Sequence, residues 1–137
     1  MIVYILFYIV AAGTAALGAR YSFTKVPTDY HAAIFESTGA ALNDTTLVIL
    51  RGLYRVIGGI SLALALALTG ITALLLPVAP WEASMVIGLS ALLSGLPSGL
   101  IAYGIAQKYN VNSPWKPALG LTALAVIGAA IGVATGG

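Results

Sequence analysis

The chain has little charge and no cysteine. Only 7% of its 137 residues are Asp, Glu, Lys or Arg, whereas 60% are hydrophobic. Soluble proteins carry about 25% charged residues, so this composition excludes a soluble fold. The absence of cysteine excludes disulfides, thiolate metal sites and cysteine nucleophiles. A formal net charge of +2 is too small to indicate a nucleic-acid partner.

The sequence also lacks the motifs and membrane-embedded charges on which many membrane enzymes and proton-coupled transporters depend. No Asp, Glu, Lys or His lies in the central part of an apolar segment. The single histidine, His31, excludes ligation of a haem by two histidines of one chain. No Gly-x-Ser-x-Gly or His-Glu-x-x-His motif occurs. The sequence therefore predicts a non-enzymatic protein with no catalytic residue, metal or cofactor.

Four long apolar segments fill most of the chain. A helix needs about 20 apolar residues to cross the hydrocarbon core of a membrane. The segments lie at residues 2–19, 50–76, 83–107 and 115–136. Pro77 and Pro80 separate the second from the third, and we expect Ser113 to cap the fourth and Pro114 to begin it. We predict a single all-α domain that forms an integral membrane four-helix bundle.

The first apolar segment ends in small residues of the kind that precede signal-peptide cleavage sites. No Lys or Arg precedes the segment, however, and a signal peptide begins with a basic region. We therefore expect residues 2–19 to remain as the first membrane span.

The basic residues all lie at one end of the predicted spans. They are Arg20, Lys25, Arg51, Arg55, Lys108 and Lys116. The connection between the second and third spans contains one charged residue, Glu82. Because basic connections stay in the cytoplasm, the positive-inside rule places both termini on the outer side of the membrane.

The connection between the first and second spans is the only long one. It contains three of the four acidic residues and His31. Loops longer than about 15 residues are usually functional or disordered, and this composition does not favour disorder. We predict that the residues after Pro27 form a short helix, capped by Thr28, which lies along the membrane interface.

Arg51 and Arg55 lie one helical turn apart at the start of the second span, so they share a helix face. The favoured interpretation is an interfacial anchor that sets the topology. We expect Arg55, the deeper of the two, to form a salt bridge with an acidic residue of the first connection: Asp29, Glu36 or Asp44. The alternative is a ligand-binding site formed by Arg51, Arg55, His31, Asp29 and Glu36. Metal binding by His31 and its acidic neighbours is a weaker hypothesis.

Small residues recur at helical spacing along the last two spans. Gly95 and Gly99 in the third span, and Gly128 and Gly132 in the fourth, predict faces on which helices approach closely. Pro97 lies between the first two glycines and predicts a kink. A row of hydroxyl groups from Ser90, Ser94 and Ser98 accompanies this face. We favour a packing role for these serine hydroxyls over a polar pathway through the membrane.

The stretch LRGLYRVIGGISLALAL, which opens the second span, resembles the DoxX-like group of small four-helix bacterial membrane proteins. The matching residues are Arg51, Arg55, Gly58 and Gly59. The resemblance covers roughly the first half of the chain and includes no catalytic motif. It implies a bacterial inner membrane protein with an accessory role beside a redox partner.

We therefore predict an accessory or assembly subunit whose partners are the lipid bilayer and either another membrane protein or a second copy of this chain. Two alternatives stay open. One is a small transporter or a lipid- or quinone-binding protein that uses the kink at Pro97. The other is a membrane enzyme with a site at the cytoplasmic interface.

Overall fold

The computed structural model describes residues 1–136, and every regular element in this range is helical. The elements are α1 (Ile2–Phe23), α2 (Asp29–Thr38), α3 (Asp44–Gly70), the π-helical turn η1 (Ile71–Leu75), α4 (Pro80–Tyr109) and α5 (Trp115–Thr135). Four helices are long and apolar enough to cross a membrane: α1, α3 continued by η1, α4 and α5. The predicted all-α four-helix membrane bundle, with a short helix in the first connection, is confirmed.

Three of the spanning helices extend beyond the apolar segments that predicted them. The longest, α3 with η1, covers 32 residues, or about 48 Å at 1.5 Å per residue. It exceeds a hydrocarbon core of about 30 Å, so part of the helix projects beyond that core. The helix begins where the Asn43 side chain accepts a hydrogen bond from Thr46 N at 2.8 Å. This capped start explains why α3 begins at Asp44, before the hydrophobic run.

The predicted start of α5 was wrong. Pro114 occupies the N-cap position instead of the first helical position, and no side chain caps the helix. Ser113 Oγ donates instead to Ala102 O of α4, at 2.6 Å. The hydroxyl therefore ties the last connection to the preceding helix and does not start the next one.

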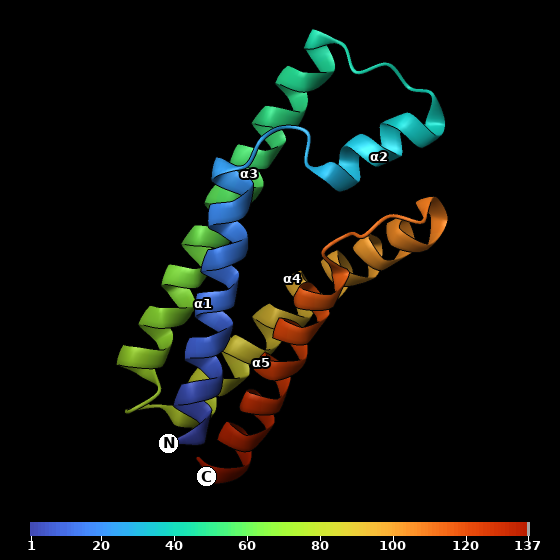
Figure 1. The fold of residues 1–137 in the computed structure, drawn as a ribbon. Coiled ribbons are helices and arrows are strands. Elements are labelled where there is room, and N and C mark those ends of the chain that lie inside the picture. Colours follow the sequence, from blue (N-terminus) through green and yellow to red (C-terminus); the bar gives the residue numbers. More distant parts are fainter. Residues whose placement is uncertain (137) are drawn as a thin grey trace.

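The spanning helices form two pairs. α1 packs along α3 and α4 packs along α5, and the pairs are joined mainly by α1 against α5. Figure 1 shows both termini at the end where the pairs converge, while the opposite ends diverge toward α2. The buried core includes Phe7, Leu76, Ile87 and Ala129. The bundle is therefore closed near the termini and open near α2.

Each of the four glycines predicted to form packing faces lies against a side chain of another helix. Gly95 and Gly99 lie against Thr122 and Leu119 of α5, Gly128 against Phe7 of α1, and Gly132 against Ser84 of α4. Pro97 lies in the continuous helix α4, with an exposed side chain.

The backbones of α1 and α3 approach each other closely at two glycines, Gly18 and Gly58. A Cβ atom on Gly58 would lie 2.7 Å from Ser22 N and 2.8 Å from Gly18 O, and one on Gly18 would lie 2.9 Å from Leu62 N. Glycine at both positions lets the two backbones touch. The spacing of Thr14, Gly18 and Ser22 along α1 is the signal in the sequence that points to this crossing.

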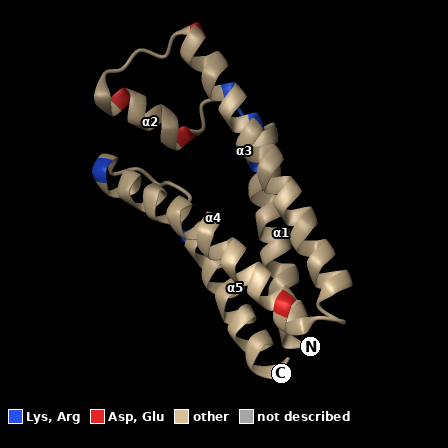
Figure 2. Cartoon of the chain, turned by 180° about the vertical axis from the view of Figure 1, so that it is seen from behind, with Lys and Arg blue, Asp and Glu red and all other residues tan. Residues whose placement is uncertain are grey.

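The basic residues gather at the α2 end of the bundle, where the acidic residues of the first connection also lie. Arg20 lies in the last turn of α1 and Lys108 in the last turn of α4, whereas Glu82 lies in the first turn of α4. Figure 2 shows Lys and Arg toward the α2 end, opposite the termini. The structure therefore gathers the basic residues at the open end of the bundle.

Candidate functional site

A cavity of about 590 Å³ lies between the two helix pairs. This volume falls within the range of about 300–1,000 Å³ that is typical of ligand-binding pockets. All four spanning helices contribute to its wall, and Tyr30 and His31 of α2 line one end. Along α1 the lining runs from Val10 to Tyr21, about three helical turns. We name this space the central cavity.

Most of the wall is aliphatic, and several of the side chains that α3 contributes to it are uncovered. Leu53, Ile57 and Ile60 line the central cavity with exposed fractions of 51%, 45% and 64%. The uncovered apolar face of α3 reflects the divergence of the two helix pairs, because α4 packs on α5 and not on α3. An apolar molecule in the cavity would cover these side chains.

Hydroxyl groups interrupt the aliphatic wall without making it strongly polar. Ser94 and Ser98 line the cavity, and the hydroxyl of each donates to the carbonyl four residues earlier in α4 at 2.6 Å. Thr122 of α5 donates in the same way to Ala118 O, at 2.9 Å. Because their protons are used within the helices, these groups leave the middle of the cavity poor in hydrogen-bond donors.

The α2 end of the cavity is polar. Five side chains form what we name the cap cluster: Tyr21, Thr28, Tyr30, His31 and Tyr54. Thr28 N donates to Tyr54 Oη at 3.1 Å, and Thr28 Oγ1 lies 2.9 Å from both Tyr54 Oη and His31 Nδ1. His31 Nδ1 also forms a hydrogen bond with Tyr54 Oη. These contacts fasten the start of α2 to α3.

Thr28 occupies the predicted N-cap position of α2, but its side chain forms no capping hydrogen bond with the helix. The hydroxyl is used in the cap cluster instead, where Thr28 and Tyr54 are exposed by only 7% and 2%. A buried hydroxyl needs hydrogen-bond partners, and these two satisfy each other. The residue that the sequence assigns to helix initiation therefore serves a contact between helices.

Aromatic contacts extend the cap cluster to α1. The Tyr21 ring meets the Tyr54 ring edge-on, with centroids 5.5 Å apart, and the Tyr30 ring lies over the His31 ring at 3.9 Å. The hydroxyls of Tyr21 and Tyr30 are 3.4 Å apart. α2 is thus held across the open end of the bundle by residues from both α1 and α3.

Burial favours the uncharged forms of His31 and Tyr30. It lowers the pKa of His31 below its ordinary value of 6.5, and burial together with the hydrogen bond between Tyr30 and Tyr21 raises the pKa of Tyr30 far above its usual range. At neutral pH His31 is therefore a neutral imidazole. Nδ1 is the ring nitrogen that forms hydrogen bonds with Thr28 Oγ1 and Tyr54 Oη.

We expect the imidazole of His31 to titrate with a midpoint below 6.5. Burial disfavours the charged form of the imidazole, which lowers the pKa of His31. Folding should therefore be least favourable below the folded-state pKa, and stability should rise as the pH rises to about 6.5. Because the chain has one histidine, its imidazole signals in an NMR titration are unambiguous. A midpoint at or above 6.5 would contradict the partial burial of His31 in the cap cluster.

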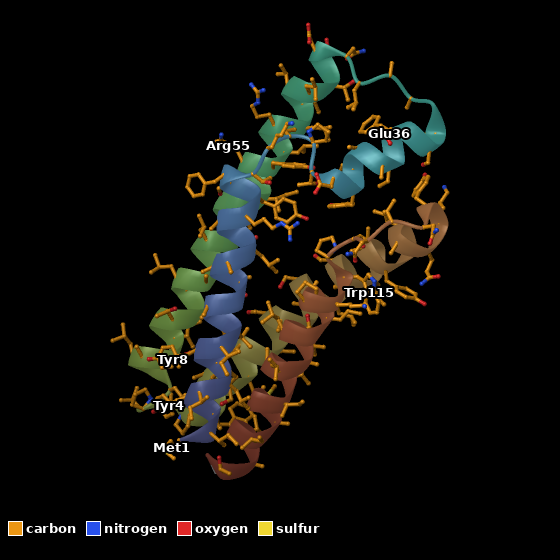
Figure 3. The ribbon with its side chains drawn as sticks, in the orientation of Figure 1. Met1, Tyr4, Tyr8, Glu36, Arg55 and Trp115 are labelled. Carbon is orange, nitrogen blue, oxygen red and sulfur yellow. The ribbon has the colours of Figure 1, made fainter. Side chains whose placement is uncertain are left out.

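The structure does not join the predicted arginines to the acidic residues of the first connection. Arg51 and Arg55 are exposed on α3, and within residues 1–136 no salt bridge links them to Asp29, Glu36 or Asp44. Figure 3 places Arg55 on the outer side of α3, away from Glu36 on α2. His31 contacts Tyr54 instead of an arginine. Over the same residues, no group of three His, Cys, Asp or Glu side chains is placed to hold a metal ion.

Tyr21, Tyr30 and Tyr54 were missed as site residues by the sequence interpretation, which followed charge. Tyr54 lies between Arg51 and Arg55 in the chain but is buried, whereas both arginines are exposed. Its position between two polar residues at a span boundary was the available signal.

No family model matches the chain, and no curated protein or solved structure shows significant similarity to it.

Proposed function

We propose that this multi-pass membrane protein binds one amphiphilic, membrane-soluble molecule in the central cavity. Its polar head would lie at the cap cluster and its apolar chain along the uncovered face of α3. The observation that carries the proposal is the division of the cavity into a polar end and an aliphatic remainder. An amphiphile is the ligand class that matches both parts at once.

A helix of a partner protein is the competing occupant of such a space. A membrane-spanning helix is about 30 Å long and about 10 Å wide, so it needs a path that continues beyond the cavity. The cap cluster holds α2 at the end of the cavity through contacts with Tyr21 and Tyr54. This closure favours a ligand that ends at the cluster. An accessory subunit, as the DoxX-like resemblance implies, could present such a ligand to a membrane protein partner.

The experiment that tests the proposal is native mass spectrometry of the protein purified from membranes in mild detergent. We expect one added mass per chain, retained after a wash that removes annular lipid. Chains that carry no added mass at any detergent concentration that preserves helicity would overturn the proposal.

We further propose a bacterial inner membrane location with α2 on the cytoplasmic side and both termini outside. The support is the gathering of basic residues at the α2 end. Single cysteines replacing Ala79 and Asn112 in this cysteine-free chain test it with an impermeant thiol reagent. Labelling from outside is expected at position 79 and not at position 112. The reverse pattern would contradict the orientation.

A further inference from the structure

We infer that the head group of the bound molecule is uncharged and accepts hydrogen bonds through a carbonyl or hydroxyl oxygen, so that the ligand is a neutral lipid and not a phospholipid. This inference rests on the proposed function, because it names the chemical class of the ligand in the same cavity. It is argued from the charges and hydrogen-bond donors around the cap cluster.

No ionisable side chain of the Lys, Arg, Asp or Glu type lines the central cavity in the part of the chain that the structure describes. A phosphate head group placed there would lose its hydration without gaining a cationic partner, which is costly in an apolar surrounding. A neutral head group has no such cost. The composition of the wall therefore selects against charged lipids.

The nearest cations lie outside the cavity. Arg20 lines a separate groove between α1 and α5, where its neighbours include Gly13, Ala16 and Pro117. The positive charge of Arg20 lowers the pKa of Tyr30, but burial raises this pKa by more. Arg51 is exposed on α3. An anionic head group would be drawn to these outer positions and not to the cap cluster.

The cap cluster has donors left over after its internal hydrogen bonds are counted. The hydroxyls of Tyr21 and Tyr30 share one contact at 3.4 Å, which uses one of their two protons. Both hydrogen bonds that the structure gives His31 within residues 1–136 use Nδ1, so we place the imidazole proton on Nε2, where a ligand oxygen can accept it. The raised pKa of Tyr30 and the lowered pKa of His31 keep both groups as neutral donors at pH 7. A ligand oxygen that accepts these protons would complete the network.

The test compares two probes that differ only in the head group. 1,2-Dioleoylglycerol and dioleoylphosphatidate have the same acyl chains, and only the second has a phosphate. Delipidated protein in detergent is mixed with each probe, and binding is measured by native mass spectrometry. We expect dioleoylglycerol to bind at least about tenfold more tightly, because only the phosphate must be desolvated without a counter-ion.

A third probe identifies the source of the neutral head group. Ubiquinone with two isoprenoid units carries carbonyl oxygens on a planar ring, and dioleoylglycerol carries a hydroxyl and ester carbonyls on a flexible head. Preference for either neutral probe over dioleoylphosphatidate supports the inference, and the stronger binder indicates whether the natural ligand is an isoprenoid or an acylglycerol.

Two variants separate the head-group claim from general lipid binding. Tyr30→Phe should weaken binding of the neutral probe about fivefold, the usual effect of losing one hydrogen bond. Arg20→Gln, outside the central cavity, should leave it unchanged. If dioleoylphosphatidate binds as well as dioleoylglycerol and loses affinity in Arg20→Gln, the head group is anionic and the inference is overturned, while the proposed function stands. If no probe binds to the parent protein, the proposed function itself fails.

Discussion

Replacing Ser94 with Trp is expected to lower the amount of amphiphile retained by the purified protein at least about tenfold. Ser94 is exposed into the middle of the central cavity, where an indole ring would occupy the path of the apolar chain. The substitution removes the hydrogen bond from the Ser94 hydroxyl to Ser90 O, but this carbonyl still accepts the backbone hydrogen bond of the helix. The variant should therefore fold and yet fail to bind.

Leu93→Trp provides the matched control for this change. Leu93 is the preceding residue in α4, is 79% exposed, and lies outside the set of residues that line the cavity. The same bulky side chain at this position should face the bilayer and leave ligand retention unchanged. Native mass spectrometry of both variants, with circular dichroism to verify helicity, makes the comparison. Equal retention in the two variants would contradict binding in the central cavity.

The second large effect is expected at the crossing of α1 and α3. Gly58→Ala should destabilise the protein by about 1–3 kcal/mol, because the new methyl group overlaps the backbone of α1. A Cβ atom there would lie 2.7 Å from Ser22 N and 2.8 Å from Gly18 O, atoms that cannot move without shifting α1. Since α1 also carries Tyr21, the shift would disturb the cap cluster.

Gly59→Ala is the control for the crossing. A Cβ atom on Gly59 would meet no atom within 4 Å, so the substitution should be neutral or up to about 1 kcal/mol stabilising through helix propensity. Unfolding of both variants by SDS in mixed micelles, followed by circular dichroism, gives the difference in free energy. Equal stability of the two variants would show that α1 and α3 do not touch at Gly58.

The helices were predictable from the sequence because their signal is local. An apolar run, or a proline such as Pro77 or Pro80, is recognised from a few neighbouring residues. The thickness of the hydrocarbon core then sets how many apolar residues a spanning helix needs. The ends were less accurate. Asn43 starts α3 before the apolar run, and Ser113 bonds to α4 instead of capping α5.

The central cavity could not be predicted because it depends on how helix pairs diverge. Hydropathy is the same for an apolar residue that packs on a helix and for one that lines a cavity, so Ile57 and Ile60 carry no distinguishing signal. The cap cluster joins Thr28 to Tyr54 across 26 residues of sequence. The sequence interpretation selected Arg51 and Arg55 because they are charged. The cap cluster is formed instead by neutral side chains, which neither secondary-structure propensity nor charge patterns identify.

The most direct test of ligand binding in the central cavity is a set of intermolecular NMR contacts between the ligand chain and alanine methyl groups. Ala91, Ala102 and Ala118 line the cavity, whereas Ala63 and Ala130 are exposed elsewhere on the bundle. In deuterated detergent with a protonated ligand, we predict nuclear Overhauser effects to the first three methyl groups and none to the other two. Effects of equal strength at all five would mean that the molecule is annular lipid, and the proposed function would be wrong.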